Sequence, residues 1–200
     1  MTLRSLRLPS GLTIEDMPAK LVGLMSRWYE VYDAVNVAQD NILRPEEIAL
    51  SIMMNSRISG NTGLEVWRQR AAIQAHLARL PSSADLAADD VPWEALRELF
   101  DVFDATPRAR LGVATKILHK KRPRLIPMLD SRLVSYYHPR LPTRSPTLGG
   151  HAVNLMKLFR DDLIAALPEL WRLCAEVEQA GCPVTPVRML DHLVWSQISG

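Results

Sequence analysis

The residues best suited to chemistry lie in a basic segment, residues 105–145. This segment carries ten Lys and Arg residues and a single acidic one, Asp130, for a net charge of +9. Such one-sided charge, where it forms one surface, attracts polyanions, because phosphates release their counterions on binding. Asp130 is the single acid of this stretch, which a purely solubilising surface would not require, and this favours a functional role for the residue. The segment therefore predicts nucleic-acid binding, with Asp130 as a candidate functional residue.

Two simpler interpretations fit the same basic segment. Residues 84–104, directly before it, have a net charge of −6, so the two segments can neutralise each other within the fold. The run Lys120-Lys121-Arg122-Pro123-Arg124 also resembles a nuclear-localisation signal. Under either interpretation the basic residues need no nucleic-acid partner.

Most familiar catalytic and metal-binding motifs are absent from the sequence. It contains no glycine-rich nucleotide-binding loop, no H-E-x-x-H and no G-x-S-x-G. The five histidines lack ligand spacing, and Cys174 and Cys182 are too few to hold a four-thiolate metal site. We therefore expect neither a metal nor a cofactor.

One stretch inside the basic segment carries an ordered motif. It begins Arg110-Leu-Gly-Val-Ala-Thr-Lys-Ile-Leu-His119, and after the basic run it continues Leu125-Ile-Pro-Met-Leu-Asp-Ser-Arg-Leu-Val134. A glycine turn, a Thr-bearing helix and an Asp opening the next helix resemble the core of the helix-hairpin-helix DNA glycosylase superfamily. Residues 46–57 and 190–195 are more loosely similar to the early and closing helices of that superfamily. The resemblance thus spans residues 45–195.

The resemblance implies a DNA site and a reaction. Backbone N–H groups at the glycine turn and helix start would bind phosphate, with Gly112 on one glycine position, Arg110 on the other and Thr115 on the threonine. The lysine of the lyase members falls on Ala114, which implies a monofunctional glycosylase in which Asp130 stabilises the sugar cation and orients water. The implied DNA-binding residues are Arg110, Gly112, Thr115, Lys116, Lys120, Lys121, Arg122 and Arg124.

A glycosylase that extrudes a nucleotide needs a side chain to fill the gap. The resemblance places Asn55 and Arg57 in that wedge position, while the alternative is an ordinary helix end whose dipole Arg57 stabilises. Asp130 has a similar alternative, because Asp before a helix that opens at Ser131 is a good N-cap. The catalytic and capping roles of Asp130 are compatible.

Apolar residues recur at helical spacing nearly throughout, and no stretch alternates long enough to predict a sheet. Expected helices run over residues 18–38, from 45 to before 59, from 62 to 80, from about 92 to 103, and over 113–120, 131–137, 151–167, 168–179 and 186–198. Thr62 and Glu65 are expected to form a capping box, and Thr185 with Pro186 to open the last helix. Residues 139–150 are expected to form a surface loop.

These patterns predict an all-α, two-lobed single domain over residues 1–200 with a helix-hairpin-helix element. A core of about residues 45–138 would be joined by the loop 139–150 to C-terminal helices at 151–198. No apolar stretch reaches the roughly 18–20 residues of a membrane span, and the first residues lack the apolar block of a secretory signal. We therefore expect no membrane partner and a cytoplasmic location.

The leading hypothesis from the sequence is a protein that binds duplex DNA and can excise a base with Asp130. One alternative is a non-catalytic DNA-binding domain of the same fold. Another is an interaction domain whose basic segment docks on the acidic residues 84–104 or on an acidic partner. The sequence leaves the lesion, the choice between DNA and RNA, and the oligomeric state undecided.

Overall fold

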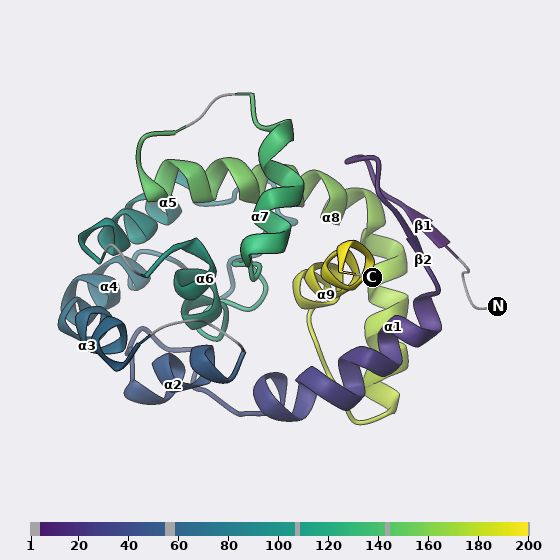
Figure 1. The fold of residues 1–200 in the computed structure, drawn as a ribbon, viewed down its shortest axis with the longest axis horizontal. Helices are drawn as coiled ribbons and strands as arrows, with labels where there is room; N and C mark the ends of the chain where they lie inside the picture. The colour runs from purple at the N-terminus through teal and green to yellow at the C-terminus, as the bar shows by residue number, and fades with distance from the viewer. Residues whose placement is uncertain (1–4, 55–58, 107–108, 143–144, 200) are drawn as a thin grey trace.

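The computed structural model of the chain describes residues 5–54, 59–106, 109–142 and 145–199. The fold is mostly helical, which confirms the all-α class (Figure 1). Its helices are α1 (Met17–Gly23), η1 (Leu24–Asp33), α2 (Pro45–Met53), α3 (Gly60–Arg68), α4 (Arg70–Leu77), α5 (Trp93–Asp101), η2 (Val102–Ala105), α6 (Leu111–His119), α7 (Ser131–Tyr137), η3 (His138–Arg140), α8 (Leu148–Gln179) and α9 (Pro186–Ile198). Of the η elements, η1 is a π-helix, and η2 and η3 are 3₁₀ helices.

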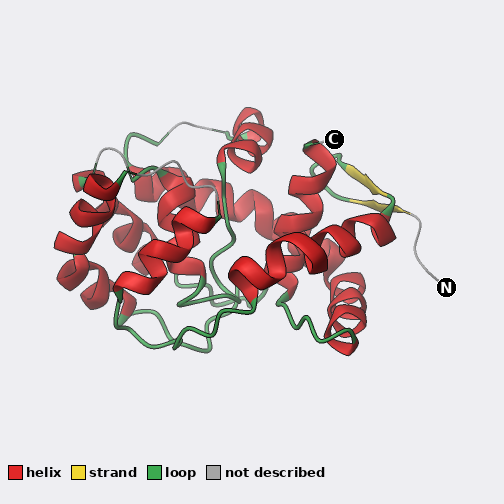
Figure 2. Cartoon of the chain, turned by 60° about the horizontal axis from the view of Figure 1, so that its bottom comes forward, coloured by secondary structure: helices red, strands yellow, loops and turns green. Residues whose placement is uncertain are grey.

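A short β-hairpin that the sequence pattern did not predict precedes α1. Strands β1 (Ser5–Arg7) and β2 (Thr13–Glu15) pair antiparallel, with Leu6 opposite Ile14. Three-residue strands are too short to show a period-two pattern, so the expectation of no sheet was wrong here. The hairpin lies near the C-terminal end of the chain in both views (Figures 1 and 2), where the Glu15 N–H donates to Gln197.

Several predicted helix boundaries are confirmed. Helix α2 begins at Pro45, α7 covers residues 131–137, and α9 covers residues 186–198. The Thr185 hydroxyl caps α9 by accepting from the Arg188 N–H at 3.1 Å. Local capping chemistry was sufficient to locate these ends because a capping residue and the backbone N–H that it accepts from lie within one turn of the chain.

Other boundaries were wrong. The expected helix 62–80 begins earlier, because the Ser59 hydroxyl rather than Thr62 is the cap, and it breaks at Gln69 into α3 and α4. The expected helix 18–38 changes into the π-helix η1 and ends at Asp33. The two helices expected at 151–167 and 168–179 are one, α8, with Pro168 inside it. A proline removes one helical hydrogen bond and bends the helix without having to end it, and Figure 1 shows α8 bent.

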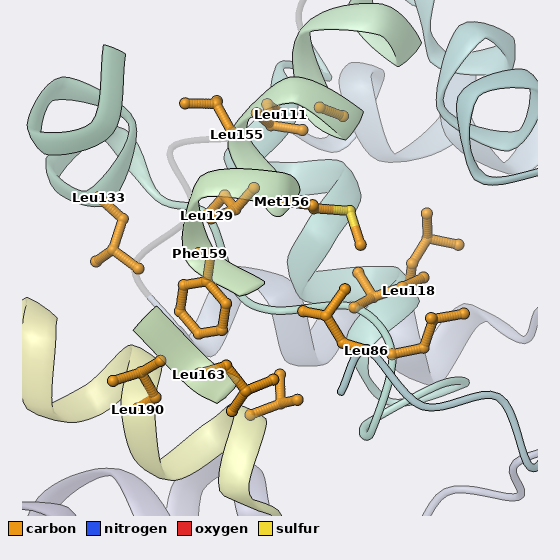
Figure 3. Packing of buried hydrophobic residues seen from close by; sticks show 14 of the residues in the cluster. Leu86, Leu111, Leu118, Leu129, Leu133, Leu155, Met156, Phe159, Leu163 and Leu190 are labelled. Carbon is orange, nitrogen blue, oxygen red and sulfur yellow. The ribbon is translucent and has the colours of Figure 1, made fainter. Parts of the chain in front are cut away.

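Helix α8 belongs to the large hydrophobic cluster, which it shares with the helices before it. It packs mainly against α5 and α9. Figure 3 shows Met156 and Phe159 of α8 among leucines from other elements. These are Leu86, Leu111 and Leu118 of α6, Leu129, Leu133 of α7 and Leu190 of α9. The C-terminal helices therefore complete the core around α6 and α7.

A buried arginine joins the end of α4 to the turn after α6. Arg122 is 2% exposed, and its guanidinium donates to the carbonyl oxygens of Leu77 and Leu80 at 3.0 and 2.8 Å. It also donates to the Asn41 side chain. The last carbonyls of a helix have no partner within it, so this cation both satisfies them and offsets the negative end of the helix dipole.

Arg122→Ala should lower the free energy of unfolding by about 3 kcal/mol, because it removes the donor of the Leu80 carbonyl and the buried contacts of the guanidinium, while the Leu77 carbonyl keeps the Leu80 N–H. Arg124→Ala is the matched control: Arg124 is exposed and paired with Asp85, so its loss should cost less than about 1 kcal/mol. Urea unfolding of both variants measures the difference. Equal losses would show that Arg122 has no special structural role.

Two buried histidines predict a pH dependence of stability. Burial lowers the pKa of His119 and of His192 to about 4, and each ring contacts a backbone oxygen, of Ile126 and Lys20 respectively. The unfolded chain binds these protons more tightly, so stability falls as the pH drops from about 6.5 toward 4, by roughly 1.4 kcal/mol per pH unit for each histidine. Asp191 opposes one of them, because burial raises its pKa to about 7.

We therefore expect urea unfolding at pH 6.5 and pH 4.5 to show a net loss of stability on acidification. The double variant His119→Asn, His192→Gln replaces each ring by an amide that does not titrate, and it should lose this decline. A variant that keeps the slope of the natural chain would assign the pH dependence to other groups.

Candidate functional site

The N-terminal ends of α6 and α7 lie against each other at Gly112. A Cβ atom added to Gly112 would lie 3.3 Å from the Asp130 Cα and 3.5 Å from the Leu129 carbonyl oxygen. Any side chain there would push these backbones apart, which explains a glycine within the first turn of α6. The close approach brings Asp130 beside the start of α6.

The segment that carries Asp130 is fixed from two sides. The Thr115 hydroxyl of α6 accepts from the Leu129 N–H at 3.1 Å and donates to the Leu111 carbonyl at 2.9 Å. From α9, the Asp191 carboxylate accepts from the Met128 N–H at 3.4 Å. Thr115 and Asp191 therefore set the position of the backbone directly before Asp130.

Asp130 is the N-cap of α7, as the capping alternative predicted. Its Oδ1 accepts from the N–H groups of Arg132 and Leu133 at 2.9 and 3.1 Å. Its Oδ2 has no hydrogen bond among the residues that the structure describes. The half-buried carboxylate thus has one oxygen held by the helix and one oxygen open to a ligand.

Two exposed arginines flank this carboxylate. Arg110 is the N-cap residue of α6, and Arg132 lies in the first turn of α7. Arg110 was expected in the site from the sequence, whereas Arg132 was not. Its position two residues after Asp130 was the available signal.

Lys116 lies one turn after Gly112 on α6 and is 8% exposed. Its ammonium donates to the carbonyl of Met54, at the end of α2, at 2.7 Å. Burial lowers the pKa of Lys116, while the carboxylates of Asp130 and Asp191 act in the opposite direction. Lys116 therefore connects α6 to the end of α2, and its buried ammonium is not exposed for contact with a phosphate.

The expected basic surface at Lys120–Arg124 is not found as such. Lys121 is fully buried, forms ion pairs with Glu47 and Asp40, and donates to the Ala38 carbonyl. Including Lys121 and Arg122 in a DNA-contacting surface was wrong, because charge counts along a chain do not reveal which cations satisfy buried carbonyls and carboxylates.

The other two cations of the run also have partners. Lys120 is half-buried, donates to the Asp33 carbonyl at 3.2 Å and lies 4.8 Å from the centre of the Tyr32 ring. Arg124 is exposed and pairs with Asp85 of the acidic segment. The mutual neutralisation of the acidic and basic segments is thus seen at this pair.

A buried ion network, which the sequence did not reveal, contacts the backbone of the site through Asp191. The Arg188 guanidinium contacts the Asp33 carboxylate at 2.8 Å and the Asp191 carboxylate at 2.6 Å. Arg188 and Asp191 are three residues apart on α9, which is a visible helical spacing. Asp33 is 155 residues away in the sequence, so no local pattern could show that it completes the network.

The chain has a surface cleft at the opposite end of α6. It has a volume of about 430 Å³, and Tyr29, Asp33, Lys120 and Arg188 are among its lining residues. A second cleft of about 370 Å³ is lined by residues that include Arg124 and Trp171. Asp130 lines neither of these two clefts.

The remaining expectations concern the wedge residues, metal ions and membranes. The wedge candidates Asn55 and Arg57 lie outside the described residues. Within the described ranges, no three His, Cys, Asp or Glu side chains gather as a set that could hold a metal ion. No helix in those ranges is long and apolar enough to cross a membrane.

Comparison with known proteins identifies the family of the chain. No curated protein and no solved structure matches the chain. A family model described as a family of unknown function, DUF6308, matches residues 20–198. The match includes Gly112, Asp130 and the buried Arg188 network, and because it covers most of the chain, this protein belongs to the DUF6308 family.

Proposed function

We propose that this protein binds the phosphate backbone of duplex DNA where α6 and α7 begin, and that Asp130 promotes hydrolysis of an N-glycosidic bond. The observation that carries the proposal is the contact of Gly112 with Asp130. It brings two helix N-termini and a carboxylate with an open oxygen to one place, between two exposed arginines.

The phosphate site would be the start of α6. Backbone N–H groups in the first turn of a helix lack partners within it and favour anions. The structure gives α6 no side-chain cap, and its N-cap residue, Arg110, is exposed. Arg132 adds a second cation on the neighbouring helix. The proposed helix-hairpin-helix element includes α6, with Gly112 on its glycine position.

The reaction would use the open oxygen of Asp130. As the base leaves, C1′ of the sugar gains positive charge, which a nearby carboxylate stabilises. Water then adds its oxygen to C1′ and gives up a proton, which Oδ2 can accept and pass to the departing base. Ala114 offers no amine for covalent catalysis, which favours a monofunctional enzyme. This enzyme would need no cofactor and would act in the cytoplasm.

Non-catalytic DNA binding is the second candidate. The observation in its favour is that Asp130 Oδ1 already makes the two hydrogen bonds of an ordinary N-cap. The two clefts described above also do not include Asp130. The site would then position DNA through phosphate contacts alone.

Asp130→Asn separates these two candidates. Asn is also a good N-cap, so the variant should keep its fold and most of its DNA affinity while base release falls at least about 100-fold, as expected on loss of a catalytic carboxylate. Base release is measured on duplexes carrying uracil, alkylated purines, oxidised guanine or mismatches. Asp85→Asn is the matched control, because Asp85 also accepts from a backbone N–H two residues on, yet lies outside the site.

Loss of release in Asp130→Asn alone would support the glycosylase. Salt-sensitive DNA binding without any base release, by the natural chain as well, would leave the non-catalytic candidate. Absence of both signals would reject both DNA functions and favour a protein partner.

The exposed arginines predict where phosphates bind. Arg110→Ala and Arg132→Ala should each weaken duplex binding, and each should reduce the slope of log affinity against log salt by about 1. Arg124→Ala is the control, because Arg124 is exposed but already paired with Asp85. Binding isotherms at several salt concentrations measure the slopes. Unchanged slopes in both site variants would place the phosphate contacts elsewhere.

A further inference from the structure

The cleft at the C-terminal end of α6 contains a cation that no ion pair compensates. Lys120 lines this cleft of about 430 Å³ and is half-buried. Its ammonium makes one hydrogen bond among the described residues, to the Asp33 carbonyl at 3.2 Å, and no ion pair with any of them. Burial lowers the pKa of Lys120, as expected for a charge that has lost water without gaining a full partner. Two N–H donors of this ammonium are therefore left for a ligand.

The acid in the same cleft is already occupied. Both oxygens of the Asp33 carboxylate accept from the Arg188 guanidinium, at 2.8 and 3.0 Å, and the other end of that guanidinium contacts Asp191 at 2.6 Å. Asp33 is therefore not free to neutralise Lys120, and Arg188 does not present its fork to a ligand. Because two cations and one acid line the cleft, it favours an anion.

His119 adds a hydrogen-bond acceptor next to this cation. It lines the same cleft and is 2% exposed. Its Nδ1 lies 2.6 Å from the Ile126 carbonyl oxygen, and because that oxygen can only accept, Nδ1 carries the proton. Burial lowers the pKa of His119 to about 4, so the ring is neutral at pH 7 and Nε2 keeps its lone pair. Nε2 has no hydrogen bond among the described residues and is not sealed inside the core, so it is left for a donor on a ligand.

One buried ring of η1 supports both groups. The Lys120 ammonium lies 4.8 Å from the centre of the Tyr32 ring, and the His119 ring lies 6.2 Å from it. Tyr32 is itself fixed, because its hydroxyl donates to the Lys116 carbonyl at 2.6 Å. It belongs to a π-helix, a form that is rare and concentrates at functional sites. The donor and the acceptor are therefore in place before a ligand arrives, which lowers the cost of binding.

We infer that this cleft binds a small phosphorylated molecule that also carries a hydroxyl group. The Lys120 ammonium would contact the phosphate, and the His119 Nε2 would accept from the hydroxyl. Phosphate is favoured over carboxylate because a lysine is a point charge, whereas a carboxylate is best bound by an arginine fork, and Arg188 is already engaged. The volume of the cleft is that of a small-molecule site. It lies at the opposite end of α6 from Asp130 and does not depend on the proposed DNA function.

The test measures binding of small probes to the full chain by isothermal titration calorimetry. Glycerol 3-phosphate carries a phosphate and hydroxyls, whereas inorganic phosphate and glycerol each supply one half of it. We expect glycerol 3-phosphate to bind at least about tenfold more tightly than either half, because both contacts contribute. Glycerate, which has a carboxylate in place of the phosphate, should bind more weakly than glycerol 3-phosphate. An equal affinity for glycerate would overturn the phosphate class.

Two variants separate the two contacts. Lys120→Gln keeps a donor for the Asp33 carbonyl but removes the charge, so the affinity for glycerol 3-phosphate and for inorganic phosphate should fall about tenfold. His119→Asn keeps a donor for the Ile126 carbonyl but lacks Nε2, so only the affinity for glycerol 3-phosphate should fall, by about fivefold. Its unchanged affinity for inorganic phosphate would also show that this variant is folded.

Lys157→Gln is the matched control for the loss of charge. Lys157 also lies over an aromatic ring, that of Trp93, at 5.5 Å, but it does not line the cleft. This variant should bind both phosphate probes like the natural chain, and a loss equal to that of Lys120→Gln would reject the site. Failure of the natural chain to bind either phosphate probe would also reject it. If His119→Asn weakens both probes equally, or neither of them, the hydroxyl contact is wrong.

Discussion

The fold depends on cations of one segment that bind the carbonyl ends of its neighbours. Lys116 donates at the end of α2, Lys120 at the end of η1, and Arg122 at the end of α4. Each of these helices presents carbonyls without internal partners and a partial negative charge. Helix α6 and the turn after it therefore connect several elements, because one short stretch satisfies carbonyls at three helix ends.

This arrangement gives α6 two different ends. Its C-terminal half is buried, and the charges there and in the following turn are matched by carbonyls and by acids such as Glu47, which pairs with Lys121. Its N-terminal end meets α7 at the Gly112 contact and carries the exposed Arg110. The same basic segment thus supplies two kinds of cation: buried ones that stabilise the fold, and exposed ones that are available to a ligand.

The Arg188 network joins the two ends of the chain to that centre. Asp33 comes from η1 and Asp191 from α9, and Asp191 also accepts from the backbone two residues before Asp130. Two carboxylates that share one buried guanidinium are stable only when all their partners are present. Asp191 therefore connects the buried network on α9 directly to the backbone at the candidate site.

The sequence by itself determined the helical class, the ends of α7 and α9, and the position of Asp130 as a cap, because capping and apolar spacing act within one turn of the chain. Only the tertiary structure decided which cations are exposed and that Pro168 lies inside one bent helix. It also decided which side chains line the cleft at the end of α6, and the pairing of Asp33 with Arg188. The reason is that a cation is buried only where partners distant in sequence compensate its charge, and composition carries no record of those partners.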